Sequence, residues 1–65
     1  MHVKVEDILR IKNLVTSNRI TAHNMQNVNT LTDKQISEMC DVIYKRTEEI
    51  DEILFKYYKA IFFEL

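Results

Sequence analysis

The apolar residues in the second half of the chain follow a heptad period. They recur at alternating steps of three and four residues, and one charged residue interrupts them. This spacing places them on one stripe of a helix and predicts a seam that packs against other helices. Because the chain contains no glycine or proline, the helix can continue toward Leu65 and reach a length of about 50 Å. The seam residues, which we assign to an oligomer interface, are Ile36, Met39, Ile43, Arg46, Ile50, Ile53 and Tyr57.

A capping box marks the start of this long helix. Thr32 stands three residues before Gln35. The threonine hydroxyl can therefore accept the backbone N–H of Gln35, while the glutamine side chain accepts the N–H of Thr32. The sequence predicts that the helix begins directly after Thr32.

The first half of the chain predicts another helix, from Val5 to about Ser17. Glu6 and Asp7 in its first turn suit the positive end of the helix dipole. Three apolar residues are expected to form its central stripe, and three more widen that stripe. The central residues are Ile8, Ile11 and Val15, and the widening residues are Val5, Leu9 and Leu14.

The asparagine-rich stretch that follows leaves two alternatives open. Either one kinked helix runs from Val5 to Val28, or two helices are separated by a break near Asn18. In both cases we expect the chain to fold back near Asn29 and Thr30. Since glycine is absent, asparagine is expected to supply any positive φ that the reversal needs.

These elements predict an all-α fold, a helical hairpin in a single domain over residues 1–65 that self-associates into a helical bundle. A chain of 65 residues is near the lower limit for a stable lone core. One cysteine excludes an intrachain disulfide, and Cys40 with the distant His2 and His23 does not make a zinc set. We therefore expect no metal and no cofactor. A homo-oligomer, with a dimer favoured, is expected to supply the missing stability.

The charge balance argues against nucleic acid as a direct partner. The net charge is −1, and the nine basic residues are interleaved with ten acidic ones rather than gathered on one face. No apolar run approaches the ~20 residues of a membrane span, so no membrane partner is expected.

A free thiol and the absence of an export signal favour the cytoplasm. The richness in Asn, Ile, Lys and Thr is typical of an AT-rich bacterial or phage genome.

Arg46 occupies a position where the seam calls for an apolar residue, and it admits two interpretations. Its stem can lie along the seam while the guanidinium reaches Glu49 or another carboxylate. Alternatively, Arg46 and Asn18 can form a buried polar layer that fixes the register or the choice of partner.

The C-terminal end carries more aromatic residues than one seam accounts for. Phe55 and Phe62 project away from the Ile50–Tyr57 stripe, and Tyr44 and Tyr58 widen that second surface. A helix that is apolar on two sides must bury both. Either the end packs in the oligomer core, or it forms a docking surface for another protein. We assign protein binding to Phe55, Tyr58, Phe62 and Phe63.

No residue is assigned a catalytic role. Cys40 has no histidine placed to activate it and is expected to be a buried small apolar residue. The acids between Glu48 and Glu52 are expected to be solvated.

The run Ser37-Glu38-Met39-Cys40-Asp41 is similar to the Ser-Gln-x-Leu-Asp signature of the small sporulation phosphatases that dephosphorylate response regulators. Members of that family are helical hairpins of about this size, and the resemblance implies a functional role for Ser37 and Asp41. The chain departs from the signature at Glu38 and Cys40.

The function expected from the sequence is that of a small non-enzymatic protein-interaction module with a heterologous protein target. A regulator, adaptor, chaperone or phage-type inhibitor would fit, acting as a homo-oligomeric bundle. The alternatives are the aspartyl-phosphate phosphatase that the resemblance implies and a small-ligand sponge formed between subunits. The chain lacks the glycine loops and the base–nucleophile groupings that most enzymes need.

Overall fold

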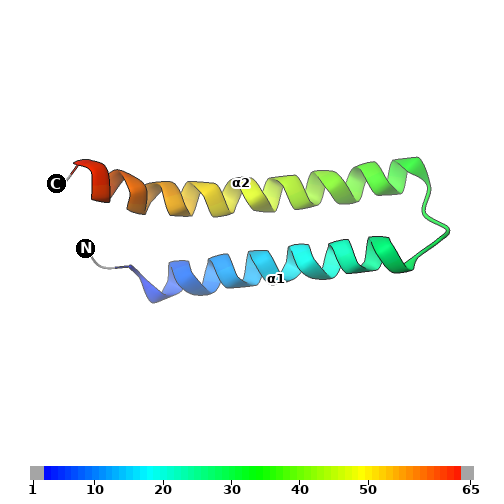
Figure 1. Ribbon diagram of the computed structural model, residues 1–65, viewed down its shortest axis with the longest axis horizontal. Helices are drawn as coiled ribbons and strands as arrows, with labels where there is room; N and C mark the ends of the chain where they lie inside the picture. Colours follow the sequence, from blue (N-terminus) through cyan, green and yellow to red (C-terminus); the bar gives the residue numbers. More distant parts are fainter. Residues whose placement is uncertain (1–2, 64–65) are drawn as a thin grey trace.

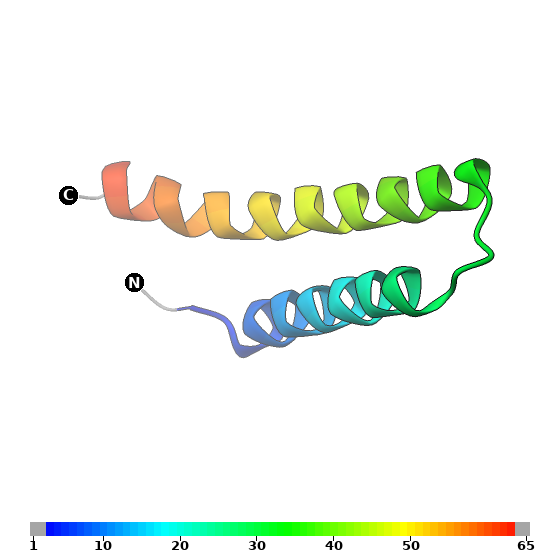
Figure 2. The same cartoon turned by 45° about the vertical axis from the view of Figure 1, so that its right-hand side comes forward.

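The computed structural model shows two antiparallel helices lying side by side and joined by one loop (Figure 1). Helix α1 runs over Val5–Asn27 and helix α2 over Asp33–Phe63. The structure describes the backbone of residues 3–63 and the side chains of residues 3–59. The predicted all-α hairpin is confirmed. It measures 51 × 18 × 13 Å, and Figure 2 shows the two helices side by side from a second direction.

Helix α1 is continuous, which decides between the two alternatives for the first half of the chain. Asn18 lies inside the helix and no break occurs there. Its side chain bonds to α2 instead of competing for the local backbone. At the C-terminal end, Asn27 Nδ2 donates to the carbonyl oxygen of His23 at 3.1 Å and so satisfies one of the last carbonyls of the helix.

The chain reverses at residues 29–30, as predicted. The expectation that asparagine supplies positive φ there is wrong. Among the described residues none has a positive φ, and Val28 leaves α1 in an extended conformation with φ −110° and ψ 109°. The turn at residues 29–30 is therefore made with negative φ throughout, which does not require glycine or asparagine.

The capping box at the start of α2 is confirmed. Thr32 N donates to Gln35 Oε1 at 2.9 Å, and Gln35 N donates to Thr32 Oγ1 at 3.1 Å. The first helical bond runs from Ile36 N to Thr32 O at 3.0 Å. These bonds satisfy two backbone donors that would otherwise be free at the helix end and so fix where α2 begins.

The core of the hairpin is a thin seam between the helices. Among the described side chains only Leu14, 6% exposed, and Ile53, 9% exposed, are buried apolar residues. The predicted central stripe of the first helix is wrong in two of its three members, because Ile8 and Val15 are 50% and 51% exposed. The stripe that faces α2 is shifted round the helix, so Leu14 lies at its centre and Ile8 and Val15 lie at its edge.

Candidate functional site

The predicted seam of α2 lies along α1 within the same chain. Ile53 is buried, and five other seam residues are half-buried; Ile36 is the exception, at 39% exposed. A role of these residues in an oligomer stays a prediction. The half-buried residues are Met39, Ile43, Arg46, Ile50 and Tyr57.

A polar layer crosses the middle of this seam. Asn18 Nδ2 donates to the carbonyl oxygen of Ile43 at 3.3 Å and to Thr47 Oγ1 at 3.4 Å. Arg46 Nη1 donates to Thr21 Oγ1 at 2.9 Å. The four bonded side chains project from neighbouring turns of the two helices. Arg46 and Asn18 therefore belong to one polar layer, which is half-buried rather than buried. Its role in fixing the register or the choice of partner stays a prediction.

The alternative interpretation, in which the Arg46 guanidinium reaches Glu49 or another carboxylate, does not hold, because among the described residues Arg46 bonds to Thr21 and makes no ion pair. Glu49 is bound to Arg10 of α1 through both carboxylate oxygens, and the Arg10 Nη2 to Glu49 Oε1 distance is 2.9 Å. Hydrogen bonding from Arg10 holds the pKa of Glu49 below its usual value, and the carboxylate in turn raises the pKa of Arg10. The Glu49 carboxylate is therefore paired with Arg10 rather than with Arg46.

One acceptor of the polar layer has no donor. The Oδ1 atom of Asn18 is buried and has no hydrogen-bond partner. A buried unpaired oxygen costs about 1–3 kcal/mol. The amide therefore carries a cost in stability at this position of the seam.

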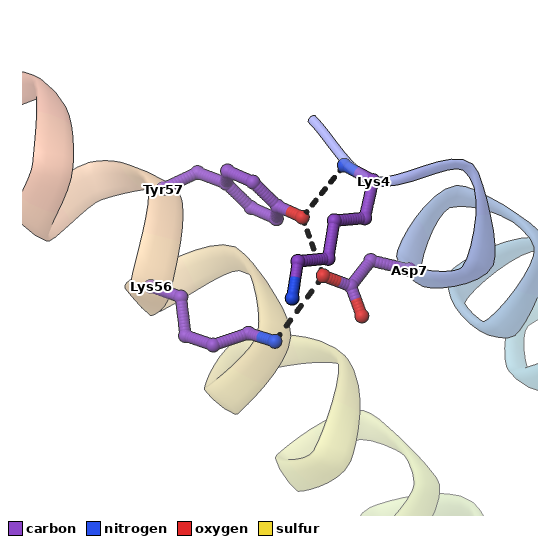
Figure 3. Close-up of polar contacts among 4 residues, drawn as sticks. All are labelled: Lys4, Asp7, Lys56 and Tyr57. Atoms are coloured by element: carbon purple, nitrogen blue, oxygen red, sulfur yellow. Dashed lines mark hydrogen bonds and ion pairs between the residues drawn. The ribbon is translucent and has the colours of Figure 1, made fainter. Parts of the chain in front are cut away.

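A second cluster of polar contacts joins the start of α1 to the C-terminal part of α2 (Figure 3). The Tyr57 hydroxyl donates to Asp7 Oδ2 and accepts the backbone N–H of Lys4 at 3.1 Å. Lys56 Nζ donates to the same Asp7 oxygen at 3.2 Å. The Asp7 side chain is only 17% exposed. Tyr57 therefore places its ring in the seam and its hydroxyl on the first turn of α1.

These contacts shift two pKa values in opposite directions. The hydrogen bond from Tyr57, followed by that from Lys56, holds the pKa of Asp7 below its ordinary 3.8. The same Tyr57–Asp7 bond, followed by partial burial, raises the pKa of Tyr57 above 10.0. The sequence interpretation missed this cluster, because it assigned Asp7 only to the helix dipole. The signal was a tyrosine in an apolar seam, whose hydroxyl needs a partner.

The aromatic residues assigned to protein binding are exposed where the structure describes them. Phe55 is 62% exposed and Tyr58 56%, and Tyr44 on the same helix is 66% exposed. Phe55 lies two residues after buried Ile53 and two before Tyr57, so it points away from α1. The backbones of residues 62 and 63 belong to α2, but the side chains of Phe62 and Phe63 lie outside the described residues.

The residues weighed for catalysis do not converge in the described part of the chain. Cys40 is exposed, so the expectation of a buried cysteine is wrong. Ser37 and Asp41 are both exposed and one turn apart on α2. His23 is bonded to Asn27 at the far end of α1, and His2 lies outside the described residues. Among the residues described, no three His, Cys, Asp or Glu side chains group to hold a metal ion.

Comparison with known proteins adds no relative, since no family model, curated protein or solved structure matches the chain. Within the described residues, neither helix combines the length and the apolar character needed to cross a membrane. Two features therefore stand out as candidate functional surfaces. The first is formed by the exposed aromatic residues Tyr44, Phe55 and Tyr58 of α2. The second is the polar layer formed by Asn18, Thr21, Arg46 and Thr47.

Proposed function

We propose that the chain is a small, non-enzymatic protein-interaction module that acts as a homo-oligomeric helical bundle, with a dimer favoured, on a heterologous protein target. A regulator, an adaptor, a chaperone or a phage-encoded inhibitor acts in this way. The observation that carries the proposal is the exposure of Phe55 at 62% and Tyr44 at 66% on the side of α2 that faces away from α1. The free thiol of exposed Cys40 favours a reducing cytoplasm as the place of action.

Exposed aromatic rings on a stable helix are typical anchors of protein–protein interfaces. Phenylalanine and tyrosine offer a large apolar area with few rotatable bonds, so binding orders them at little entropic cost. Phe55 and Tyr44 are three helical turns apart and share one outward stripe. A partner with an apolar groove can engage both at once.

A pair of matched variants tests this surface. Phe55→Ser is expected to keep the helical circular dichroism of the wild type and to lose the target in a pull-down from the host. Leu9→Ser is the control, because Leu9 is a comparably exposed apolar residue, 52%, on α1, and it is expected to keep both. Once the target is identified, its affinity for each purified variant gives the size of the effect. Wild-type affinity in the Phe55→Ser variant would contradict the proposal.

Two further substitutions and one screen separate this function from the alternatives. A phosphatase that used Ser37 and Asp41 would lose its action on a phosphorylated response regulator with Asp41→Ala or Ser37→Ala. An interaction module keeps its target and its stability with either, because both residues are exposed. A small-ligand sponge would be revealed by a raised melting temperature in a screen with nucleotides.

A further inference from the structure

Three of the exposed apolar residues of α1 form a continuous stripe on one flank of that helix, next to the seam. Ile8, Val15 and Ala22 follow one another at steps of seven, and all three are exposed, Ile8 at 50% and Val15 at 51%. They lie about 80–120° round the helix from buried Leu14. The apolar arc of α1 is therefore about twice as wide as its contact with α2 requires.

Helix α2 has a matching flank. Ile36 is 39% exposed, Leu54 40% and Tyr58 56%, and these residues lie about 100–140° round α2 from buried Ile53, in the same rotational sense. Because the helices are antiparallel, the same sense of rotation from the facing residues leads to the same side of the hairpin. We call this surface the apolar side; its residues are Ile8, Val15, Ala22, Ile36, Leu54 and Tyr58.

The opposite side of the hairpin is more polar, although it exposes Ile20 and Val42. The Arg10–Glu49 ion pair and the Lys56–Asp7 ion pair bridge the helices there. A two-helix layer with one apolar and one more polar side has the pattern of half a four-helix bundle, in which each helix contacts two neighbours. The hairpin supplies one of those neighbours to each helix.

The exposed area fits a missing second layer. The chain exposes 5617 Å², whereas a compact folded chain of its 7.8 kDa exposes about 4,400 Å². The excess of about 1,200 Å² exceeds the ~800 Å² per partner that a stable protein interface buries. The radius of gyration agrees, at 15.4 Å against about 11 Å for a compact chain of this length.

Charges at the rim of the apolar side point to a second copy and to its orientation. The rim of α1 is basic, with Lys12 and Arg19, and the rim of α2 carries Asp51. The Asp7–Tyr57 and Asn18–Thr47 contacts place Lys12 opposite residues 52–53, which is less than one helical turn from Asp51 along the hairpin. A twofold axis parallel to the helices leaves each residue at the same height along the hairpin and sets Lys12 beside Asp51 of the second copy. A twofold axis perpendicular to the helices instead packs α1 on α1 of the second copy, so that the two basic rims face each other.

We propose that the apolar side is a dimer interface for a second copy of this chain, with both loops at the same end and each α1 packed on α2 of the other copy. This inference rests on the proposed function and deepens its oligomeric part. The arrangement is isologous, so every rim pair occurs twice. Phe55 points away from the interface and stays available to a target.

Charge reversal tests both the surface and the orientation. In sedimentation equilibrium the wild type is expected to be a dimer at micromolar concentration. Lys12→Glu and Asp51→Lys are each expected to weaken dimerisation about tenfold, since each reverses two rim pairs, and the double variant is expected to return to within about twofold of the wild type. Unchanged single variants, or a Lys12→Glu dimer tighter than the wild type, would overturn the proposal. The second outcome indicates an axis across the helices.

Apolar substitutions test the surface independently of the rim charges. Val15→Glu is expected to give a helical monomer, because Val15 is half exposed in the hairpin and becomes buried only in the dimer. Ile20→Glu is the matched control, with Ile20 55% exposed on another flank of α1, and it is expected to remain a dimer. A dimer in the Val15→Glu variant, or equal disruption by both, would overturn the proposal.

A distance measurement fixes the orientation. Nitroxide labels at Asn29→Cys in a Cys40→Ser background lie at the two loops. With the loops at the same end, neighbouring helix axes about 10 Å apart place the labels about 20–30 Å from each other. With loops at opposite ends, the labels are separated by about the 51 Å length of the hairpin. If the wild type is a monomer that still binds its target through Phe55, the dimer is excluded and the docking function stands.

Discussion

Replacing Asn18 with leucine is expected to stabilise the protein. The amide sits half-buried in the middle of the seam between α1 and α2. It donates two hydrogen bonds and leaves its own oxygen without a donor. Leucine has a similar size and removes the unpaired oxygen.

The magnitude follows from the contacts that are lost and gained. The two bonds, at 3.3 Å and 3.4 Å, are at the long end of the range, so each contributes less than about 1 kcal/mol. Neither acceptor depends on Asn18, because the Ile43 carbonyl also accepts from Thr47 Oγ1 at 2.9 Å and the Thr47 side chain is exposed to water. Removing the unpaired oxygen recovers about 1–3 kcal/mol, and leucine adds apolar burial. The expected net gain is about 1–2 kcal/mol, which raises the melting temperature by about 4–8 °C per kcal/mol.

Thermal and urea unfolding followed by circular dichroism, at one fixed protein concentration, measures this gain. Asn13→Leu is the control, because Asn13 is exposed on the same helix and the change raises helix propensity equally. The difference between the two variants reports the tertiary contribution alone. An Asn18→Leu variant less stable than the wild type, or no more stable than the Asn13→Leu variant, would refute the assignment of a net cost to the polar layer.

Three other predictions concern the core, the cap and the ion-paired cluster. Leu14→Ala is expected to lower the free energy of unfolding by about 2–3 kcal/mol, at the low end for leucine because the two-helix core is thin; urea unfolding measures it. Thr32→Ala is expected to cost about 1 kcal/mol with the fold retained, by the loss of the capping bond. Stability is expected to be highest between about pH 5 and pH 10. The lowered pKa values of Asp7 and Glu49 give stability that is present above their unfolded values, 3.8 and 4.5, and is lost as the pH falls through the folded ones. The raised pKa of Tyr57 gives stability that is present below 10.0 and is lost as the pH rises through the folded value.

Each of these predictions has a control. Asn24→Ala, at an exposed position, should leave stability within about 0.5 kcal/mol of the wild type, in contrast to Leu14→Ala. Thr30→Ala, in the loop, should cost less than Thr32→Ala, and equal effects would place the helix start elsewhere. Asp7→Asn should flatten the acid limb of the pH profile, and an unchanged limb would show that other carboxylates cause the loss.

The sequence by itself determined the local features of this protein. The heptad spacing of α2 and the capping box at Thr32 each depend on residues a few positions apart. The structure shows the capping box, and the seam apart from Ile36, where the pattern placed them. The reversal at residues 29–30 was equally local, because it fell between two apolar patterns. The conformation of the loop was not, since its turn forms without the expected positive φ.

The tertiary structure alone decided which side of α1 faces α2. Apolar residues cover a wide arc of α1, and periodicity gives the width of such an arc without saying which part is covered. Leu14 is buried and Val15 is half exposed, although both belong to that arc. The continuity of α1 through Asn18 was decided in the same way, by the bonds of its amide to α2.

The partners of the polar side chains also depended on the tertiary structure. Arg46 bonds to Thr21, and Tyr57 bonds to Asp7 fifty residues away. Such pairs follow from the register of one helix along the other. That register is set by the whole seam and by the length of the loop, and no local pattern in the sequence encodes it.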